Sequence, residues 1–226
     1  MKNQNISVCF TLIAIIYILC FVIDNFLEMK VISIFGFSTT AGTIIWSIVY
    51  ILDDCLTEVY GYKKARWVMW VTLISNAIIV LLLQFVCWLP SPIPWEGEAA
   101  FNEVFSYAPR IFLATFVSFF LGSTINATIL SKMKMYSSGK YFKIRAIAST
   151  VFGVGVESSV FFLLAFYGEM SLIDIGKITL DSWILMIVYE IAVLPITNKV
   201  VNYLKQKENI DTYDNGISYN PFSFSV

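Results

Sequence analysis

The chain has 226 residues, of which 58% are hydrophobic and only 14% are charged, with a formal net charge of −1 and an isoelectric point near 5.5. A soluble domain carries about 25% charged residues, and so few charges would not cover the surface of so apolar a core. The low net charge argues against a nucleic-acid-binding protein, which needs a dense basic surface. The lack of histidine excludes His-ligated metal sites and histidine general bases. The composition therefore predicts an integral membrane protein.

Six long apolar segments predict an all-α fold with six transmembrane helices, since a spanning helix needs about 20 mostly apolar residues. The first segment ends around Asp24 and Glu28 and lacks a cleavage site, so we expect a retained helix rather than a signal peptide. The second is expected to begin near Ser38 and to stop at Gly61, and Pro195 is expected to bend the sixth. The predicted spans are residues 6–27, 38–60, 67–89, 108–131, 144–168 and 180–204.

The distribution of basic residues indicates the orientation of this transmembrane domain, which covers residues 1–204. Basic residues are enriched in cytoplasmic loops, and twelve of the 15 in this chain fall on one side of the six predicted spans. They are Lys2, Lys63, Lys64, Arg66, Lys132, Lys134, Lys140, Lys143, Arg145, Lys199, Lys205 and Lys207. Both termini are therefore expected in the cytoplasm. Residues 205–226 are predicted to form a polar cytoplasmic tail that extends without a core.

Polar residues within the predicted spans are candidates for function, because a carboxylate at mid-bilayer costs about 2.5–3.5 kcal/mol. Glu157 is the strongest, with long uncharged stretches on both sides, and Glu190 is a second. Glu157 would serve as a ligand or proton site. The alternatives are a structural pair with another helix, for example with Arg110 or Lys143, and a carboxyl kept neutral by burial. Asn76 and Asn126 are predicted to be buried amides that contact a ligand or join helices by hydrogen bonds.

A stripe of residues at i, i+4 spacing follows one face of the second predicted span: Trp46, Tyr50, Asp54 and Glu58. The aromatic residues could stack on a flat ring, and the carboxylates could accept its hydrogen bonds. The alternative is that the aromatic residues pack in the core while the acids lie at a solvated helix end, paired with Lys63, Lys64 or Arg66.

Enzyme motifs are absent from the sequence. It contains no P-loop, no GxSxG segment and no Cys/His pairing, so it is not expected to be an enzyme or to hydrolyse ATP. No metal site or cofactor is predicted. Small residues on the fourth and fifth spans, among them Gly122 and Gly153, are interpreted as positions of close helix packing.

The run Asp54-Cys55-Leu56-Thr57-Glu58-Val59-Tyr60-Gly61-Tyr62-Lys63-Lys64-Ala65-Arg66 resembles the signature of the queuosine precursor transporters, also called the vitamin uptake transporter family. Further matching positions are Asn25, Arg110, Arg145, the segment 149–153 and Leu194-Pro195, so the resemblance spans nearly the whole chain. It implies a bacterial inner-membrane protein with a fold similar to the substrate-binding subunits of energy-coupling-factor vitamin transporters.

The resemblance also implies import of a 7-deazaguanine, such as preQ0, preQ1 or queuine, for the queuosine modification of tRNA. One carboxylate can accept the ring N–H and the exocyclic amine together, an amide can serve the ring carbonyl, and aromatic faces can stack on the bicycle. Glu157, Asn126 and Trp46 or Tyr50 are the candidates for these roles. Asp54 or Glu58 would receive the cationic amine of preQ1 or queuine. Asn25, Arg110, Asn76 and Glu190 complete the predicted substrate-binding set.

This chain departs from the family pattern at three positions. Members often carry aspartate where Glu157 and Asn126 stand, and lysine where Leu185 stands, which leaves the preferred precursor open. Partners are expected to be the small-molecule substrate and the bilayer, with an ATP-driven energy-coupling module as one option for driving transport. Alternatives are a transporter of another vitamin or nucleobase, and a receptor or scaffold that acts through its tail. Removal of residues 205–226 is expected to spare transport but to abolish a scaffold's function.

Overall fold

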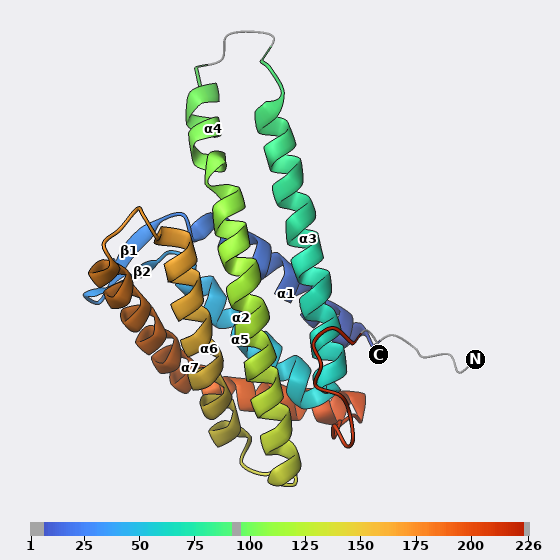
Figure 1. Ribbon diagram of the computed structural model, residues 1–226. Helices are drawn as coiled ribbons and strands as arrows, with labels where there is room; N and C mark the ends of the chain where they lie inside the picture. Colours follow the sequence, from blue (N-terminus) through green and yellow to red (C-terminus); the bar gives the residue numbers. More distant parts are fainter. Residues whose placement is uncertain (1–6, 92–95, 224–226) are drawn as a thin grey trace.

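A computed structural model describes residues 7–91 and 96–223 of the chain. The first predicted span begins at residue 6, which lies outside the described residues. The structure is mostly helical, with one short hairpin (Figure 1). Its elements are α1 (Val8–Leu27), β1 (Val31–Ile34), β2 (Phe37–Thr40), α2 (Thr43–Cys55), the π-helix η1 (Leu56–Tyr60), α3 (Tyr62–Trp88), α4 (Glu98–Ser106), α5 (Ala108–Tyr136), α6 (Phe142–Phe166) and α7 (Leu172–Glu208).

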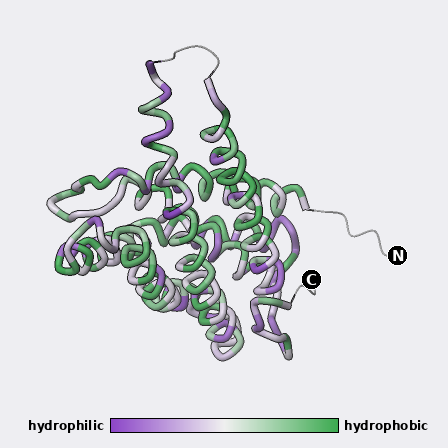
Figure 2. Tube along the Cα trace, turned by 45° about the horizontal axis from the view of Figure 1, so that its top comes forward, coloured by the Kyte–Doolittle hydropathy of each residue, from purple (hydrophilic) through white to green (hydrophobic). Residues whose placement is uncertain are grey.

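Five helical segments among the described residues are long and apolar enough to cross a membrane. They are α1, α3, the continuous α4–α5 segment, α6 and α7. Large apolar side chains such as Leu12, Leu19 and Leu81 lie exposed on their outer surfaces, where lipid would cover them. Figure 2 shows hydrophobic residues along most of the long helices, whereas hydrophilic residues gather in α4 and in the C-terminal tail.

The second predicted span is shorter than expected, because its predicted start forms a strand. Residues 37–40 pair with residues 31–34 in an antiparallel hairpin, with Val31 opposite Thr40. Phe35 and Gly36 connect the strands, and both have positive φ, as a tight two-residue hairpin turn requires. The helix therefore begins at Thr43 rather than near residue 38, and α2 with η1 covers only residues 43–60.

The last helix is longer than the predicted span 180–204, since α7 runs from Leu172 to Glu208. Ser171 caps its first turn by accepting a hydrogen bond from the backbone N–H of Asp174. Figure 1 shows α7 bending near its middle, so that its second half (orange-red) runs across the lower part of the bundle in that view. Pro195 lies inside the helix and removes one backbone hydrogen bond there, which accounts for a bend.

The C-terminal tail does not extend away from the bundle, so that prediction is wrong. Asp214 accepts hydrogen bonds from the backbone N–H of Tyr62 (3.0 Å) and from the hydroxyl of Ser131 (2.5 Å). The Trp70 indole donates to the carbonyl of Pro221 at 2.8 Å. Tyr62 is the first residue of α3, where helical N–H groups lack partners, so the polar tail supplies acceptors to the end of a helix.

Replacement of Asp214 by alanine tests this capping role. We expect the free energy of unfolding to fall by about 1–2 kcal/mol, because α3 loses its cap and the hydroxyl of Ser131 loses an acceptor. Chemical denaturation of the purified protein in detergent measures the change. The matched control is Asn215→Ala at the exposed neighbouring position. Equal stability of the two variants would contradict a capping role for Asp214.

Candidate functional site

A small cavity lies between α1, α2, α5, α6 and α7, with a volume of about 20 Å³. Its lining combines carboxylates, hydroxyls and aromatic rings, and none of the described lining residues is basic. The lining residues are Asp24, Glu28, Thr43, Trp46, Thr115, Ser118, Glu157, Ser158, Phe161, Phe162, Ser182 and Met186. A cavity of this volume holds about one water molecule. The helices must therefore separate before an organic molecule could occupy it.

Glu157 projects from α6 into this cavity and is only 4% exposed. The hydroxyl of Tyr50 donates a hydrogen bond to Glu157 Oε2, and Trp46 lines the same cavity one turn before Tyr50 on α2. The structure thus brings together three of the predicted site residues. Among the described hydrogen bonds and ion pairs, Glu157 contacts neither Arg110 nor Lys143, and its partner on another helix is Tyr50.

Gly122 on α5 provides the space that this arrangement needs. A Cβ at residue 122 would lie 2.6 Å from the Cβ of Glu157 and 2.9 Å from the Tyr50 hydroxyl. On the facing helix, a Cβ at Gly153 would lie 2.8 Å from the Cβ of Asn126. A real Cβ atom does not come within 3.0 Å of another non-bonded heavy atom, so these glycines allow α5 and α6 to approach closely.

Asp24 and Glu28 line the cavity as well, and sequence reasoning missed both as site residues. Asp24 lies in the last turn of α1, and Glu28 directly follows that helix, one turn later. Their side chains are 1% and 7% exposed, and both lie against the backbone of Gly42 just before α2. The two acids were interpreted only as the end of a span. The i, i+4 spacing, which directs both to one side, was the available signal.

A second polar layer lies beside the cavity rather than on its wall. The amide nitrogen of Asn126 donates to Asp54 Oδ1 at 2.9 Å, and the hydroxyl of Ser123 donates to Asp53 Oδ2 at 3.0 Å. Neither Asn126 nor Asp54 is among the residues that line the cavity. In this conformation the pair joins α2 to α5.

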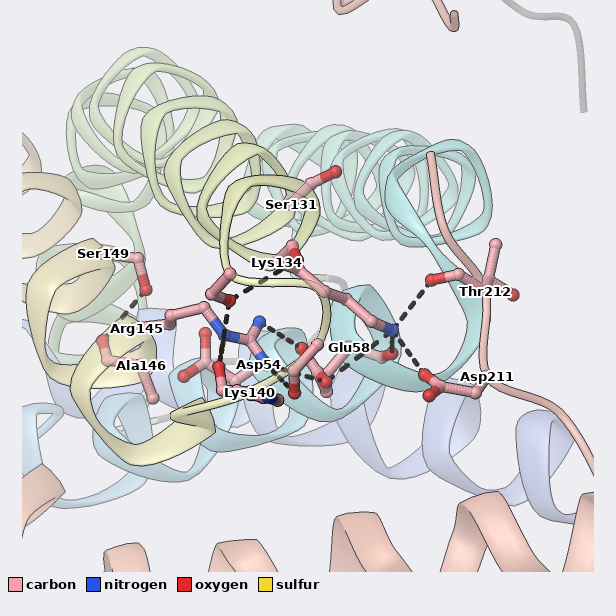
Figure 3. A network of polar contacts seen from close by, with 12 residues as sticks. Asp54, Glu58, Ser131, Lys134, Lys140, Arg145, Ala146, Ser149, Asp211 and Thr212 are labelled. Atoms are coloured by element: carbon pink, nitrogen blue, oxygen red, sulfur yellow. Dashed lines mark hydrogen bonds and ion pairs between the residues drawn. The ribbon is translucent and has the colours of Figure 1, made fainter. Parts of the chain in front are cut away.

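Glu58 lies in a buried ion-pair network at the opposite end of α2 from the hairpin (Figure 3). Arg145 binds its carboxylate through both terminal nitrogens, at 2.7 and 3.1 Å, and Lys205 Nζ lies 2.6 Å from Oε1. Lys134 Nζ is 3.6 Å from the same oxygen and 2.6 Å from Asp211. The expected partners Lys63, Lys64 and Arg66 make no ion pair with Glu58 in the described chain, so that interpretation is corrected.

Asp211 belongs to the tail and completes the network from outside the helices. Partial burial by itself would raise its pKa, but hydrogen bonds from Lys134 and Lys205 outweigh this effect and lower the pKa below its ordinary value. The tail therefore contributes a carboxylate that stays ionised at neutral pH. All the cations of the network are held by protein groups, so Glu58 has no free face for a substrate amine.

The remaining predicted site residues lie apart from the cavity lining. Arg110 pairs with Glu169 at 3.1 Å and donates to the carbonyls of Leu164 and Tyr167, which fixes the connection between α6 and α7. The Asn25 amide donates to the carbonyl of Phe21 within α1 at 2.9 Å. Two further predicted residues, Asn76 on α3 and Glu190 on α7, are buried, at 1% and 3% exposure.

Comparisons with known proteins agree with the resemblance carried by the motif 54–66. The chain is 23% identical over 155 residues to the "Queuosine precursor transporter" of Escherichia coli, covering 69% of this chain and 67% of that protein. Two proteins named "Probable queuosine precursor transporter" are each 22% identical. The match to the Bacillus subtilis protein covers 64% of this chain and 63% of the relative, and that to the Haemophilus influenzae protein 59% and 54%.

The alignments thus span between about half and two thirds of these relatives' own lengths. No solved structure matches the chain. The family model described as "Putative vitamin uptake transporter" matches residues 40–200, which includes the whole of α2, α3, α5 and α6. This match covers well over half of the chain and confirms the resemblance. The protein is a member of this vitamin uptake transporter family.

Proposed function

We propose that the protein imports a 7-deazaguanine precursor of queuosine across the bacterial inner membrane and binds it in the cavity at Glu157. The observation that carries the proposal is the pairing of a buried carboxylate with aromatic side chains in a bundle of apolar helices. The relatives' printed names support the choice of cargo.

The chemistry of the cavity suits a flat base with several hydrogen-bond donors. A carboxylate can accept the ring N–H and the exocyclic amine of a 7-deazaguanine as a bidentate pair, and Glu157 is held for this by Tyr50. Trp46 offers a ring face for stacking, worth about 1–3 kcal/mol for a base. Hydroxyls such as Thr115 and Ser118 can bind the ring carbonyl in place of Asn126, which faces Asp54.

The small volume of the cavity supports an alternating-access mechanism. At about 20 Å³ the site is contracted, and a bicyclic base would enter only when α1, α5 and α6 separate on one side of the membrane. We assign six spans by counting α2 with η1 as a short second one, which leaves both termini cytoplasmic. The fold would then resemble that of energy-coupling-factor substrate-binding subunits.

Three routes could drive uptake. A cationic precursor would gain about 2.3 kcal/mol per 100 mV of membrane potential. Buried carboxylates such as Glu157 and Glu190 could carry a coupled proton. A separate ATP-driven module is the third route.

A growth-based assay tests the proposal. Bacteria that cannot make queuosine and lack their own transporter would receive the gene and nanomolar preQ0, preQ1 or queuine, and queuosine in tRNA would be measured. We expect restoration by the wild type. Glu157→Gln should reduce uptake at least about tenfold, because the amide cannot accept two hydrogen bonds in a bidentate pair.

The matched control for this variant is Glu96→Gln, the same chemical change at an exposed position. Full activity of Glu157→Gln would keep transport but remove Glu157 from the site. Failure of all three precursors, with the protein shown to be in the membrane, would refute the proposed cargo. Deletion of residues 205–226 does not separate transporter from scaffold as expected, because Lys205, Asp211 and Asp214 bind the helices.

A further inference from the structure

The charged side chains that line the cavity are all acidic, which restricts what can bind there. Three of its lining residues are carboxylic acids, Asp24, Glu28 and Glu157, and no described lining residue is a lysine or arginine. The other polar groups of the wall are the hydroxyls of serine and threonine and the indole of Trp46. The protein thus supplies no positive side chain to balance these acids.

Asp24 and Glu28 differ in this respect from Glu58 and Asp214. Glu58 has three basic partners, and Asp214 accepts from a hydroxyl and a backbone N–H. Asp24 Oδ1 and Glu28 Oε2, in contrast, are buried without a hydrogen-bond partner in the described structure. Two oxygen atoms on neighbouring turns are therefore directed at the cavity with their acceptor capacity unused. Asp54 Oδ2 and Glu190 Oε1 also lack a hydrogen-bond partner in the described structure, but neither residue lines this cavity.

Physical chemistry indicates what such a pair would bind. Adjacent buried carboxylates repel each other and lose hydration, and a bound cation with several N–H donors relieves both costs. The N-terminus of α2 begins at Thr43, directly beside the two acids, and carries only a partial positive charge, which does not replace a full cation. A cationic ligand is therefore still needed to form an ion pair with these acids.

We infer that Asp24 and Glu28 bind a protonated amine on the 7-substituent of the base. The inference rests on the proposed function and deepens it: the transporter selects precursors with a 7-aminomethyl group, such as preQ1, over preQ0, whose 7-cyano group is neutral and has no donor. Asp24 and Glu28 replace the predicted acceptors Asp54 and Glu58 in this role, because Asp54 does not line the cavity and the basic network already occupies Glu58.

The origin of these acids fits separate roles for Glu157 and for the pair Asp24 and Glu28. In a 7-deazaguanine the ring N–H and the exocyclic amine lie on the six-membered ring, whereas the 7-substituent projects from the five-membered ring. Glu157 comes from α6, whereas Asp24 and Glu28 come from the end of α1. Acids from two helices that line one cavity can therefore bind different groups of one bicycle once the helices separate, and the ring of Trp46 can stack on its face.

The test is a comparison of preQ1 and preQ0 on the full-length protein in proteoliposomes. Uptake of labelled preQ1 is competed with unlabelled preQ1 or preQ0, and uptake of labelled preQ0 is measured directly. Wild-type protein should favour preQ1 by about 30-fold or more, as expected for a desolvated charge pair. Asp24→Asn and Glu28→Gln keep the side-chain shapes but remove a charge, and each should bring the preQ1-to-preQ0 ratio close to one. Glu96→Gln should leave the ratio at its wild-type value.

The outcomes separate this inference from the proposed function. Wild-type protein that takes up neither compound would refute the proposed function itself. Uptake of both with equal affinity, or a preference for preQ0, would overturn the inference and leave the transporter in place. An unchanged ratio in both amide variants would also overturn it. Should one variant fail to reach the membrane, the wild-type ratio and the other variant still decide.

Discussion

Replacement of Glu58 by glutamine is expected to lower the free energy of unfolding by about 3–5 kcal/mol, the usual cost of removing one member of a buried ion pair. The Glu58 side chain is fully buried, and Arg145 and Lys134 beside it are only 1% and 3% exposed. Without the carboxylate, buried Arg145 would lose its ion-pair partner, and Lys134 and Lys205 would share Asp211 alone. Denaturant titration of the purified protein in detergent measures the loss.

An exposed ion pair provides the matched control for this experiment. Glu169 pairs with Arg110 at 3.1 Å, but its side chain is 52% exposed. Glu169→Gln should therefore change stability by no more than about 1 kcal/mol. If Glu58→Gln were as mild as Glu169→Gln, the network in Figure 3 would not be a main contributor to stability.

Replacement of Gly122 by leucine is expected to abolish uptake and to cost about 3 kcal/mol of stability, because overpacking at a tight helix contact displaces its neighbours. Even a Cβ at this position would meet Glu157 and Tyr50, so a larger side chain must break their hydrogen bond or separate α5 from α6. Gly122→Ala should show the same defects in milder form. The queuosine assay measures uptake, and denaturant titration measures stability.

The matched control is Gly176→Leu, the same substitution at a position where an added Cβ makes no close contact. Gly176 lies exposed in α7, and a Cβ there would meet nothing within 4 Å. Gly176→Leu should be neutral or slightly stabilising, since glycine is a poor residue inside a helix. Normal uptake by Gly122→Leu would contradict the view that Glu157 and Tyr50 form part of the binding site.

The long apolar helices could be anticipated from the sequence, whereas the second span and the tail could not be described correctly. Residues 43–60 contain acidic side chains whose partners lie far away in the sequence. Glu58, for example, pairs with Arg145 and Lys205. The composition of a sequence segment does not reveal such long-range ion pairs. The polar composition of the tail predicts a free segment, yet Asp214 of the tail accepts a hydrogen bond from the first N–H of α3.

The candidate site was predicted in part. Glu157 stands out because it interrupts a long apolar stretch, and Trp46 and Tyr50 follow from helical spacing. Asp24 and Glu28 occur where a span ends, a place where acids are ordinary, so their direction toward the cavity is visible only in three dimensions. Asn126 is buried as expected, but its amide meets Asp54 rather than the cavity.

The network around Glu58 has a consequence for how the protein is made. Synthesis proceeds from the N-terminus, so Glu58, Lys134 and Arg145 leave the ribosome before Lys205 and Asp211, which follow more than 50 residues later. Until then, Lys134 lacks its contacts with Asp211 and Thr212. The end of the bundle that holds Glu58 is therefore completed only after Lys205 and Asp211 have been made, and a product that stops before them would leave Glu58 and Lys134 without these partners.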